Sequence, residues 1–284
     1  MENIKEYTKK SYANPFNWVG SKHRYLKEFA EVLPWDKSKL DLKVLDPFVG
    51  GGDLISKLPS AWKVDANDLM CEVYNLHKAV HSGEINSSDI LTDYNNRGMS
   101  KTNKEAFTSL RQEYNKTKDI KLLYLLMTNS FNNQLRFNMK GEFNMPFGKD
   151  RSHFSKNMQT KLDNYQLLLK GRDVNFYNKS YKDFEFSEYD LLLLDPPYSN
   201  TCATYNENTG WGYEEDIKLF EKIDSSGTDF IYFNQTWSKG VSNQVLIDWM
   251  QKYEVKVLKE TSTGCNHQRK DGFTEEVMVY NISE

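Results

Sequence analysis

The sequence predicts an α/β protein with a doubly wound, Rossmann-like parallel sheet and an inserted, mainly helical segment. Residues 43–48 (KVLDPF) are a short apolar run that ends in a glycine-rich turn, and residues 62–67 (WKVDAN) form a second short strand. Strand, glycine turn and second strand in this order are typical of the start of such a sheet. Residues 190–194 (DLLLL) are too continuously apolar for a surface strand, so we expect this strand to be buried on both faces.

The remaining elements follow from apolar spacing. A helix-like stretch is expected after the glycine turn, and residues 69–81 have the apolar spacing of a helix. Further strands are expected at 174–176, 229–233, 255–258 and 276–280, and further helices at 217–223 and 244–253.

Residues 84–165 differ in character from the segments around them, because they are polar, basic and poor in β-branched residues. Between Arg97 and Lys161 there are thirteen Lys/Arg and five Asp/Glu, a local net charge of +8 in a chain whose net charge is −3. Such asymmetry favours contact with a nucleic acid, although a solvated helical surface is the plain alternative. We therefore expect 84–165 to be a separate domain inserted into one made of 1–83 and 166–284.

Within this insert, helices are expected at 103–115 and 121–131, and a loop at 86–92. The turn residues at 138–141 lie between two aromatic-containing stretches and predict a β-hairpin.

The bulk composition excludes several classes of protein. A length of 284 residues suits one large domain or a domain with an insertion. No apolar run approaches a membrane span, and the polar N-terminus has no signal-like region, so a cytoplasmic location is expected. The three cysteines are far apart and the five histidines form no pair at ligand spacing, so neither a disulfide framework nor a metal site is predicted.

Two motifs follow expected strands. The first is Asp46-Pro-Phe48-Val-Gly50-Gly-Gly, in which the glycines let a ligand approach the backbone or simply form a tight turn. It matches neither a dinucleotide fingerprint nor a phosphate-binding loop. An acid one strand later, Asp65 or Asp68, would hold a pair of ribose hydroxyls or cap a strand end.

The second motif is Asp195-Pro196-Pro197-Tyr198, after the run of leucines. The prolines restrict the backbone and fix a carboxylate and an aromatic ring at the carboxyl end of the sheet, where doubly wound folds bind ligands. The alternative is a Pro-Pro turn in which Asp195 and Tyr198 are incidental. A third motif, NPFNWVGSK at 14–22, precedes the first strand.

In this order, the three motifs resemble the Dam-like family of DNA adenine-N6 methyltransferases, the alpha group, whose pattern is aromatic-x-Gly-x-Lys, DPFxGGG, a recognition insert and DPPY. Residues 129–149 (NSFNNQLRFNMKGEFNMPFGK) resemble the DNA-reading hairpin of the family. Residues 110–126 resemble phage Dam enzymes in particular, and restriction-modification methyltransferases belong to the same group. The resemblance covers about residues 14–281.

The resemblance implies a methyltransferase sheet that uses S-adenosylmethionine and no metal, with 84–165 as target-recognition domain and 1–83 with 166–284 as catalytic domain. It implies that Asp195 and the backbone of Pro196 accept the two N–H bonds of the target amino group, that Pro197 keeps the segment rigid, and that Tyr198 stacks on the adenine. The cofactor residues that it implies are Trp18, Gly20 and Lys22 at the methionine end, Asp46, Phe48 and Gly50 along the methionyl-ribosyl region, Asp68 at the ribose hydroxyls, Ser180 and Tyr181 near the cofactor adenine, and also Asp195.

The resemblance also implies a double-stranded DNA substrate from which the target base is flipped. Arg136 matches the guanine-reading arginine of the family, and Phe131 is either a wedge that fills the gap or a core aromatic. The other candidate DNA contacts are Pro146, Lys149 and Arg151, the last two at phosphates.

Two positions depart from the family members that methylate GATC, since Asn17 stands in place of their lysine and Gln134 in place of their apolar residue. We therefore expect a target other than GATC. A restriction endonuclease encoded nearby is a candidate functional partner, and an orphan phage enzyme is the alternative. Rival functions are an RNA or protein-glutamine methyltransferase, and a DNA-binding protein with a degenerate methyltransferase fold.

Overall fold

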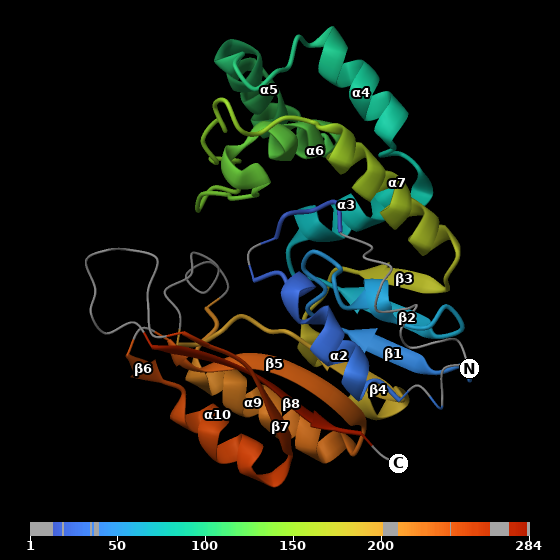
Figure 1. The fold of residues 1–284 in the computed structure, drawn as a ribbon, viewed down its shortest axis with the longest axis vertical. Coiled ribbons are helices and arrows are strands. Elements are labelled where there is room, and N and C mark those ends of the chain that lie inside the picture. The colour runs from blue at the N-terminus through green and yellow to red at the C-terminus, as the bar shows by residue number, and fades with distance from the viewer. Residues whose placement is uncertain are drawn as a thin grey trace. The chain divides into compact units, whose positions relative to one another are not determined.

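The computed structural model describes residues 14–18, 20–34, 36, 40–200, 210–238, 240–261 and 273–282. The chain falls into two compact units (Figure 1). The first comprises Met1–Leu26, Val49–Ser60 and Asp68–Asn178, and the second comprises Lys27–Phe48, Ala61–Asn67 and Lys179–Glu284.

The second unit contains a mainly parallel sheet with the strand order β2-β1-β4-β5-β8-β7. Strands β1, β2, β4 and β5 run parallel to one another, whereas β8 is antiparallel to both β5 and β7. The strands are β1 (Lys43–Asp46), β2 (Lys63–Asn67), β4 (Leu191–Leu194), β5 (Asp229–Ser238), the two-residue β6 (Val241–Ser242) beside β5, β7 (Glu254–Thr261) and β8 (Thr274–Asn281). All four leucines of β4 are buried, which confirms the expectation for residues 190–194.

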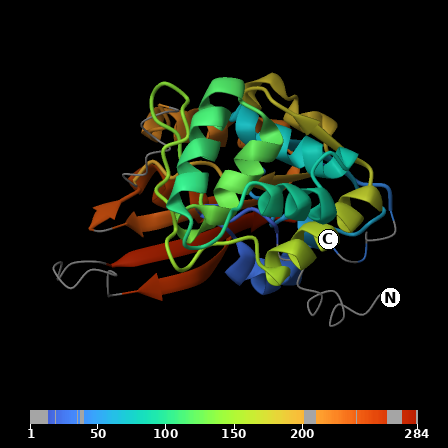
Figure 2. The same cartoon turned by 90° about the horizontal axis from the view of Figure 1, so that it is seen from above.

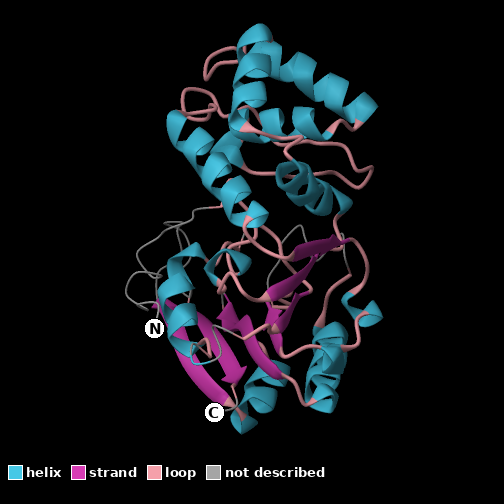
Figure 3. Cartoon of the chain, turned by 90° about the vertical axis from the view of Figure 1, so that its right-hand side faces the viewer, coloured by secondary structure: helices cyan, strands magenta, loops and turns pink. Residues whose placement is uncertain are grey.

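Helices cover both faces of this sheet, as the ribbon coloured by secondary structure also shows (Figure 3). Tyr232 and Phe233 follow one another on β5, and their side chains therefore point to opposite faces. The ring of Tyr232 packs against Phe220 of α9 (Tyr213–Ser226) and Trp249 of α10 (Gln244–Trp249), whereas Phe233 packs against Phe29 of α2 (Leu26–Val32). The expected doubly wound architecture is confirmed.

The first unit is mainly helical, with one strand, β3 (Val174–Tyr177). Its helices are α3 (Cys71–Ser82), α4 (Ser87–Asn96), α5 (Lys104–Thr117), α6 (Ile120–Asn129) and α7 (Lys156–Lys170). Helix α6, green in Figures 1 and 2, contacts α3, α4 and α5, and eight of its ten residues are buried. A helix that is apolar on every side is typical of the centre of a helical domain.

The short 3-10 helices complete the described elements. They are η1 (His23–Tyr25), η3 (Ile55–Lys57), η4 (Phe131–Asn133), η5 (Tyr181–Asp183), η6 (Phe186–Glu188) and η7 (Met250–Lys252). The helix-like stretch expected after the glycine turn is only the single turn η3.

The expected loop at 86–92 is wrong, because these residues form the first part of α4. Asn86 caps the helix, since its side chain accepts a hydrogen bond from the backbone N–H of Asp89 at 3.0 Å. Ile90 and Tyr94 lie four residues apart and are both buried, so they supply the apolar face that the polar composition obscured.

The hairpin turn at 138–141 is confirmed, although its arms form only isolated bridges. The Gly141 N–H donates to the Asn138 carbonyl at 2.9 Å, and Phe137 pairs with Phe143 in an antiparallel bridge. Both phenylalanine side chains are buried. This hairpin and the whole of 84–165 lie in the first unit, which also contains the glycine turn and α3.

Candidate active site and DNA-contacting residues

The glycine turn of the first unit is packed closely by side chains of that unit. A Cβ on Gly51 would lie 2.3 Å from Nδ2 of Asn14, and a Cβ on Gly50, whose φ is +47°, would lie 2.9 Å from Cδ1 of Trp18. A side chain at Gly50 or Gly51 would therefore collide with Trp18 or Asn14. The close packing of the chain is thus one reason for glycine at these two positions, as expected of a tight turn. The same contact brings Trp18 of the 14–22 motif together with Gly50.

Asp68, one of the two acids proposed for the ribose, is hydrogen-bonded to this turn. Its carboxylate accepts the Gly50 N–H at 3.1 Å and the Met70 N–H at 2.9 Å. Burial raises the pKa of Asp68 to about 6, and the two backbone N–H groups oppose this rise. By contrast, the Asp65 carboxylate in the second unit accepts the hydroxyl of Tyr189 at 2.9 Å. Asp68 is thus the acid that the chain places on the glycine turn.

Two further residues of the first unit support this turn, and the sequence had not singled them out. Nε2 of His77 lies 2.8 Å from the Gly50 carbonyl oxygen, and Nδ1 lies 2.8 Å from the Tyr165 hydroxyl. Burial lowers the pKa of His77 to about 4, so the ring is neutral at pH 7. Neither residue belongs to a motif, and only the fold brings α7 to the glycine turn.

The 14–22 motif is also fixed by Asp53, which follows the three glycines. The Asn14 amide donates to Oδ1 of Asp53 at 3.2 Å, and the Ser21 hydroxyl donates to Oδ2. Lys22 is buried, and its ammonium donates to the Gly20 carbonyl at 2.7 Å. The position of Asp53 directly after Gly52 was the available sequence signal for this role.

In the second unit, the Asp195–Tyr198 segment leaves the carboxyl end of β4. The Tyr198 hydroxyl lies 3.3 Å from Oδ1 of Asp195 and 3.4 Å from Oε1 of Glu276 on β8. Burial raises the pKa of Tyr198 well above its usual value, and the neighbouring carboxylates add to this effect, so the hydroxyl keeps its proton. Pro196, next to Asp195, is buried.

The other expected cofactor residues of the second unit gather in an aromatic cluster made of Phe48, Tyr181 and Trp211. The ring centroids lie 5.6 Å (Phe48–Tyr181), 5.4 Å (Phe48–Trp211) and 5.6 Å (Tyr181–Trp211) apart. Ser180 caps the short helix of Tyr181, accepting the Lys182 N–H at 3.3 Å. Asp46, at the end of β1, accepts the Phe48 N–H at 3.2 Å. Trp211 is an addition that the sequence did not suggest.

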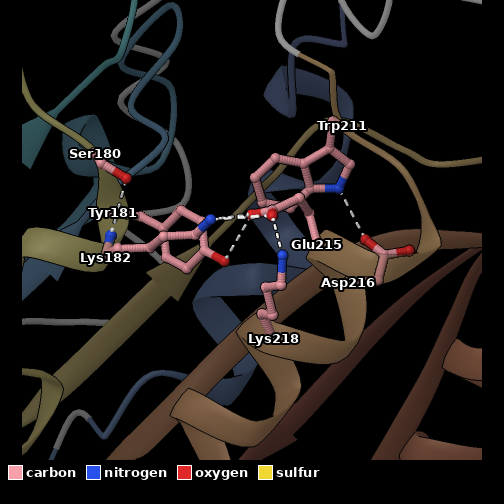
Figure 4. Close-up of polar contacts among 7 residues, drawn as sticks. All are labelled: Ser180, Tyr181, Lys182, Trp211, Glu215, Asp216 and Lys218. Carbon is pink, nitrogen blue, oxygen red and sulfur yellow. Dashed lines mark hydrogen bonds and ion pairs between the residues drawn. The ribbon is translucent and has the colours of Figure 1, made fainter.

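Two consecutive acidic residues at the start of α9 hold this aromatic cluster (Figure 4). Glu215 accepts the Tyr181 hydroxyl at 3.2 Å and pairs with the ammonium groups of Lys182 and Lys218. Asp216 accepts the Trp211 indole N–H at 2.8 Å. The first turn of α9 therefore orients two of the three rings.

Asp216 also holds the residue that follows Tyr198. Its Oδ2 accepts the Ser199 hydroxyl and the Asn243 amide, the latter at 3.2 Å. Burial raises the pKa of Asp216, while its hydrogen bonds oppose the rise. One buried carboxylate thus joins the aromatic cluster to the end of the DPPY segment.

The candidate DNA-contacting residues lie in the first unit, and their surroundings settle one alternative. The Phe131 side chain is 41% exposed, so the interpretation as a core aromatic is wrong. The Asn17 amide donates to the backbone carbonyl of Asn132, which places the 14–22 motif beside the Phe131 segment. The remaining candidates differ in how far they are exposed to solvent. Gln134 is half-buried, and the exposed ones are Arg136, Pro146, Lys149 and Arg151.

Comparison with known proteins identifies the family. The model of the D12 class of N6 adenine-specific DNA methyltransferases matches residues 18–263. The chain belongs to this family. It is 33% identical to the type II methyltransferase M.FokI of Planomicrobium okeanokoites, over 98% of the chain and 44% of that protein. It is 31% identical to the modification methylase StsI of Streptococcus sanguinis, over 96% of the chain and 43% of that protein. The chain therefore spans less than half the length of these two relatives.

The comparisons also find more distant similarities. A DNA adenine methylase of Salmonella typhi is 27% identical over 66% of this chain and 66% of its own length. Among solved structures, the magnesium protoporphyrin IX methyltransferase ChlM of Synechocystis PCC 6803 overlaps 99% of this chain and 92% of its own, at 9% identity and a TM-score of 0.34.

This family of methyltransferases uses S-adenosylmethionine. The chemical groups that this chain offers are suited to that cofactor. The first unit offers the Asp68 carboxylate, whose two oxygens each retain acceptor capacity for a hydroxyl beyond one backbone N–H. The second unit offers the aromatic cluster, a surface suited to a flat base. Among the described residues, no group of His, Cys, Asp or Glu is arranged to hold a metal ion. None of the described helices is both long and apolar enough to cross a membrane.

Proposed function

We propose that this chain transfers a methyl group from S-adenosylmethionine to the exocyclic N6 of an adenine in double-stranded DNA. The observation that supports this most strongly is the Asp195-Pro196-Pro197-Tyr198 segment at the carboxyl end of a buried strand, with the Tyr198 hydroxyl 3.3 Å from the Asp195 carboxylate. Family membership makes adenine N6 the expected acceptor.

Asp195 and Pro196 activate the acceptor in this proposal. The amino group of adenine is a poor nucleophile, because its lone pair is delocalised into the ring. The Asp195 carboxylate and the Pro196 carbonyl accept its two N–H bonds, localise the lone pair and aim it. The cofactor supplies a methyl group bonded to a positively charged sulfur, which leaves the protein the tasks of positioning and electrostatics.

Tyr198 receives the flipped base. Extrusion of a base costs a few kcal/mol of stacking and pairing, which stacking on the Tyr198 ring and the hydrogen bonds to Asp195 offset. Burial, reinforced by the two carboxylates beside its hydroxyl, keeps Tyr198 neutral, and the hydrogen bonds to these carboxylates fix its orientation. A fixed ring receives the base with a smaller loss of side-chain entropy.

The cofactor residues are proposed as follows. Asp68 accepts the ribose hydroxyls, and Tyr181 of the aromatic cluster contacts the cofactor adenine, next to Ser180. Trp18, Gly20 and Lys22 act at the methionine end, Asp46, Phe48 and Gly50 act between the two, and Asp195 also contacts the cofactor.

DNA recognition is assigned to 84–165 as a target-recognition domain, with 1–83 and 166–284 as the catalytic domain. The +8 charge between Arg97 and Lys161 supports this assignment. Arg136 reads a guanine, the exposed Phe131 fills the gap left by the flipped base, and Pro146, Lys149 and Arg151 contact the DNA around the site. Asn17 and Gln134 read bases other than those of GATC.

A restriction-modification role fits the relatives, since M.FokI and StsI are type II and modification methylases by name. The proposed functional partner is an endonuclease that cuts the same DNA sequence, without any requirement for a physical complex.

The test is a transfer assay with S-adenosylmethionine labelled in the methyl group and three acceptors: double-stranded DNA, RNA and protein. We expect label in DNA alone. After digestion to nucleosides, the label should be found in N6-methyl-2′-deoxyadenosine. Label in RNA or protein, or in a cytosine of the DNA, would contradict the proposal. Cofactor binding by calorimetry without any transfer would instead support the rival of a DNA-binding protein with a degenerate site.

A further inference from the structure

The guanidinium of Arg136 is held by a single neighbour across the hairpin, Asn144. Its Nε–H donates to Oδ1 of Asn144 at 2.9 Å, and its Nη2–H donates to the Asn144 backbone carbonyl at 3.0 Å. A third bond joins the same two residues, since the Asn144 N–H donates to the Arg136 carbonyl at 3.0 Å. Arg136 itself is exposed, and within the described part of the chain its guanidinium donates its hydrogen bonds to Asn144.

The hairpin backbone next to Asn144 is fixed to helix α5. The neighbouring Phe143 is buried, and its backbone is tied to α5 by Asn115, which accepts the Phe143 N–H at 2.8 Å and donates to the Phe143 carbonyl at 3.2 Å. A hairpin arm that is bonded at both backbone groups to a packed helix holds the next residue in a defined direction. Asn144 therefore orients Arg136 from a fixed position.

The pattern of these bonds selects one edge of the guanidinium. Arginine has five N–H groups in one plane, and Asn144 takes the edge formed by Nε and one Nη2 hydrogen. The other edge, formed by Nη1 and the second Nη2 hydrogen, presents two parallel donors. Such a pair matches the O6 and N7 acceptors of guanine in the major groove.

We infer that Asn144 is a specificity-determining positioning residue, which sets the guanine preference of the enzyme by fixing the edge that Arg136 presents to DNA. The inference rests on the proposed function, because it takes Arg136 as the guanine reader. An arginine that is already ordered loses less rotamer freedom on binding, and one whose side edge is occupied has fewer ways to contact a wrong base.

The experiment uses the full chain and a DNA library in which the positions around one adenine are randomised, with methylated molecules identified by sequencing. Arg136→Ala first defines the base pair that Arg136 reads. Asn144→Ala should lower the guanine preference at that same pair by roughly tenfold or more, within the range of a lost bidentate discrimination. Asn144→Asp, which keeps an acceptor for Nε–H, should retain the preference while its added charge weakens DNA binding in general.

Two further measurements distinguish a role of Asn144 in specificity from a merely structural role in stabilising the hairpin. The thermal midpoint of Asn144→Ala should remain close to that of the original chain, and the double variant Arg136→Ala/Asn144→Ala should have the specificity of Arg136→Ala alone. Equal loss of preference at several base pairs, or a guanine preference unchanged in Asn144→Ala but lost in Arg136→Ala, would overturn the inference. Unchanged preference in Arg136→Ala would overturn it too. Absence of any DNA methylation by the unaltered chain would instead refute the proposed function.

Discussion

The hydroxyl of Tyr198 lies between two carboxylates, 3.3 Å from Oδ1 of Asp195 and 3.4 Å from Oε1 of Glu276. Glu276 comes from β8 and is 5% exposed, so a second buried acid supports the DPPY segment from a strand 78 positions further along the chain. A phenol has one proton to donate, and the two acceptors together hold the ring in place.

This relationship gives the first prediction, which concerns Glu276. Glu276→Gln should lower kcat by about tenfold or more, since a charge-assisted hydrogen bond is worth about 1.5–3 kcal/mol. In a Tyr198→Phe background the same substitution should have little further effect, because Glu276 acts through the hydroxyl. Glu275→Gln, on the neighbouring residue of β8, is the matched control. Independent effects of the two substitutions on kcat would contradict the assigned role.

The second prediction concerns Asp195. Asp195→Ala should abolish methylation, while S-adenosylhomocysteine measured by calorimetry still binds with most of its affinity. Loss of an acceptor aimed at the reacting group typically costs about 10²-fold or more in rate. Asp190→Ala, at the other end of β4, removes a carboxylate that accepts the Lys43 N–H at 2.7 Å and serves as the control. A residual rate above about a tenth of the original would disprove the role.

The third prediction is a pH dependence caused by Asp68. Its folded pKa of about 6 lies above the ordinary value of 3.8 for an aspartate, so its contribution to stability is complete below pH about 4 and is lost as the pH rises through about 6. The loss amounts to about 3 kcal/mol at most. Urea unfolding between pH 4 and 8 should show this decline in the original chain and not in Asp68→Asn, with the exposed Asp41→Asn as control.

Cofactor affinity should have the opposite pH dependence. The ionised Asp68 carboxylate accepts hydroxyl groups better than the protonated form, so S-adenosylhomocysteine should bind more weakly below pH about 6. In Asp68→Asn the affinity should be low and independent of pH through this range. A pH-independent affinity in the original chain would remove Asp68 from the ribose site.

The fourth prediction concerns salt. Log affinity for DNA should fall linearly with log salt concentration, because the basic segment between Arg97 and Lys161 releases counterions from the phosphates. Lys149→Ala and Arg151→Ala should each reduce the slope by about 1, whereas Lys222→Ala in α9 should leave it unchanged. A flat salt response would exclude this segment as the DNA-binding face.

The sequence predicted correctly those elements that a local pattern of residues specifies. The run of leucines in β4 and the turn residues at 138–141 are where expected. The loop expected at 86–92 was wrong because Ile90 and Tyr94 alone carry the apolar face of α4 within a polar stretch. The polar composition of the stretch led to the loop prediction, because two apolar residues are a weak signal of helical spacing.

The supporting residues of the site could not be predicted in the same way. Glu276 and Asp216 acquire their roles through partners that are distant in the sequence, Tyr198 and Asn243, and neither acid belongs to a motif. The two interpretations of Phe131 differed in exposure, which depends on the tertiary packing around the residue. The domain boundaries at 83/84 and 165/166 stay a prediction.

The fifth prediction is that the target is not GATC. Asn17 and Gln134 stand where the resemblance places base readers, and an amide both donates and accepts, which suits the N6 and N7 edge of adenine. A glutamine beside a thymine methyl would lose water without gaining a partner. Arg136 retains a guanine-reading edge, so a G·C pair is expected on one side of the target adenine. Because a wrong base costs about 1–3 kcal/mol, two altered readers suffice to move the preference.

Digestion of DNA from expressing cells with a nuclease that GATC methylation blocks decides this point. We expect the DNA to be cut as completely as DNA from cells that express Asp195→Ala, while sequencing finds methyladenine at another site. The alternative is that both amides turn to phosphates and leave GATC readable through Arg136 and DNA shape. Full protection from the nuclease would establish that alternative and would show that Asn17 and Gln134 do not read bases.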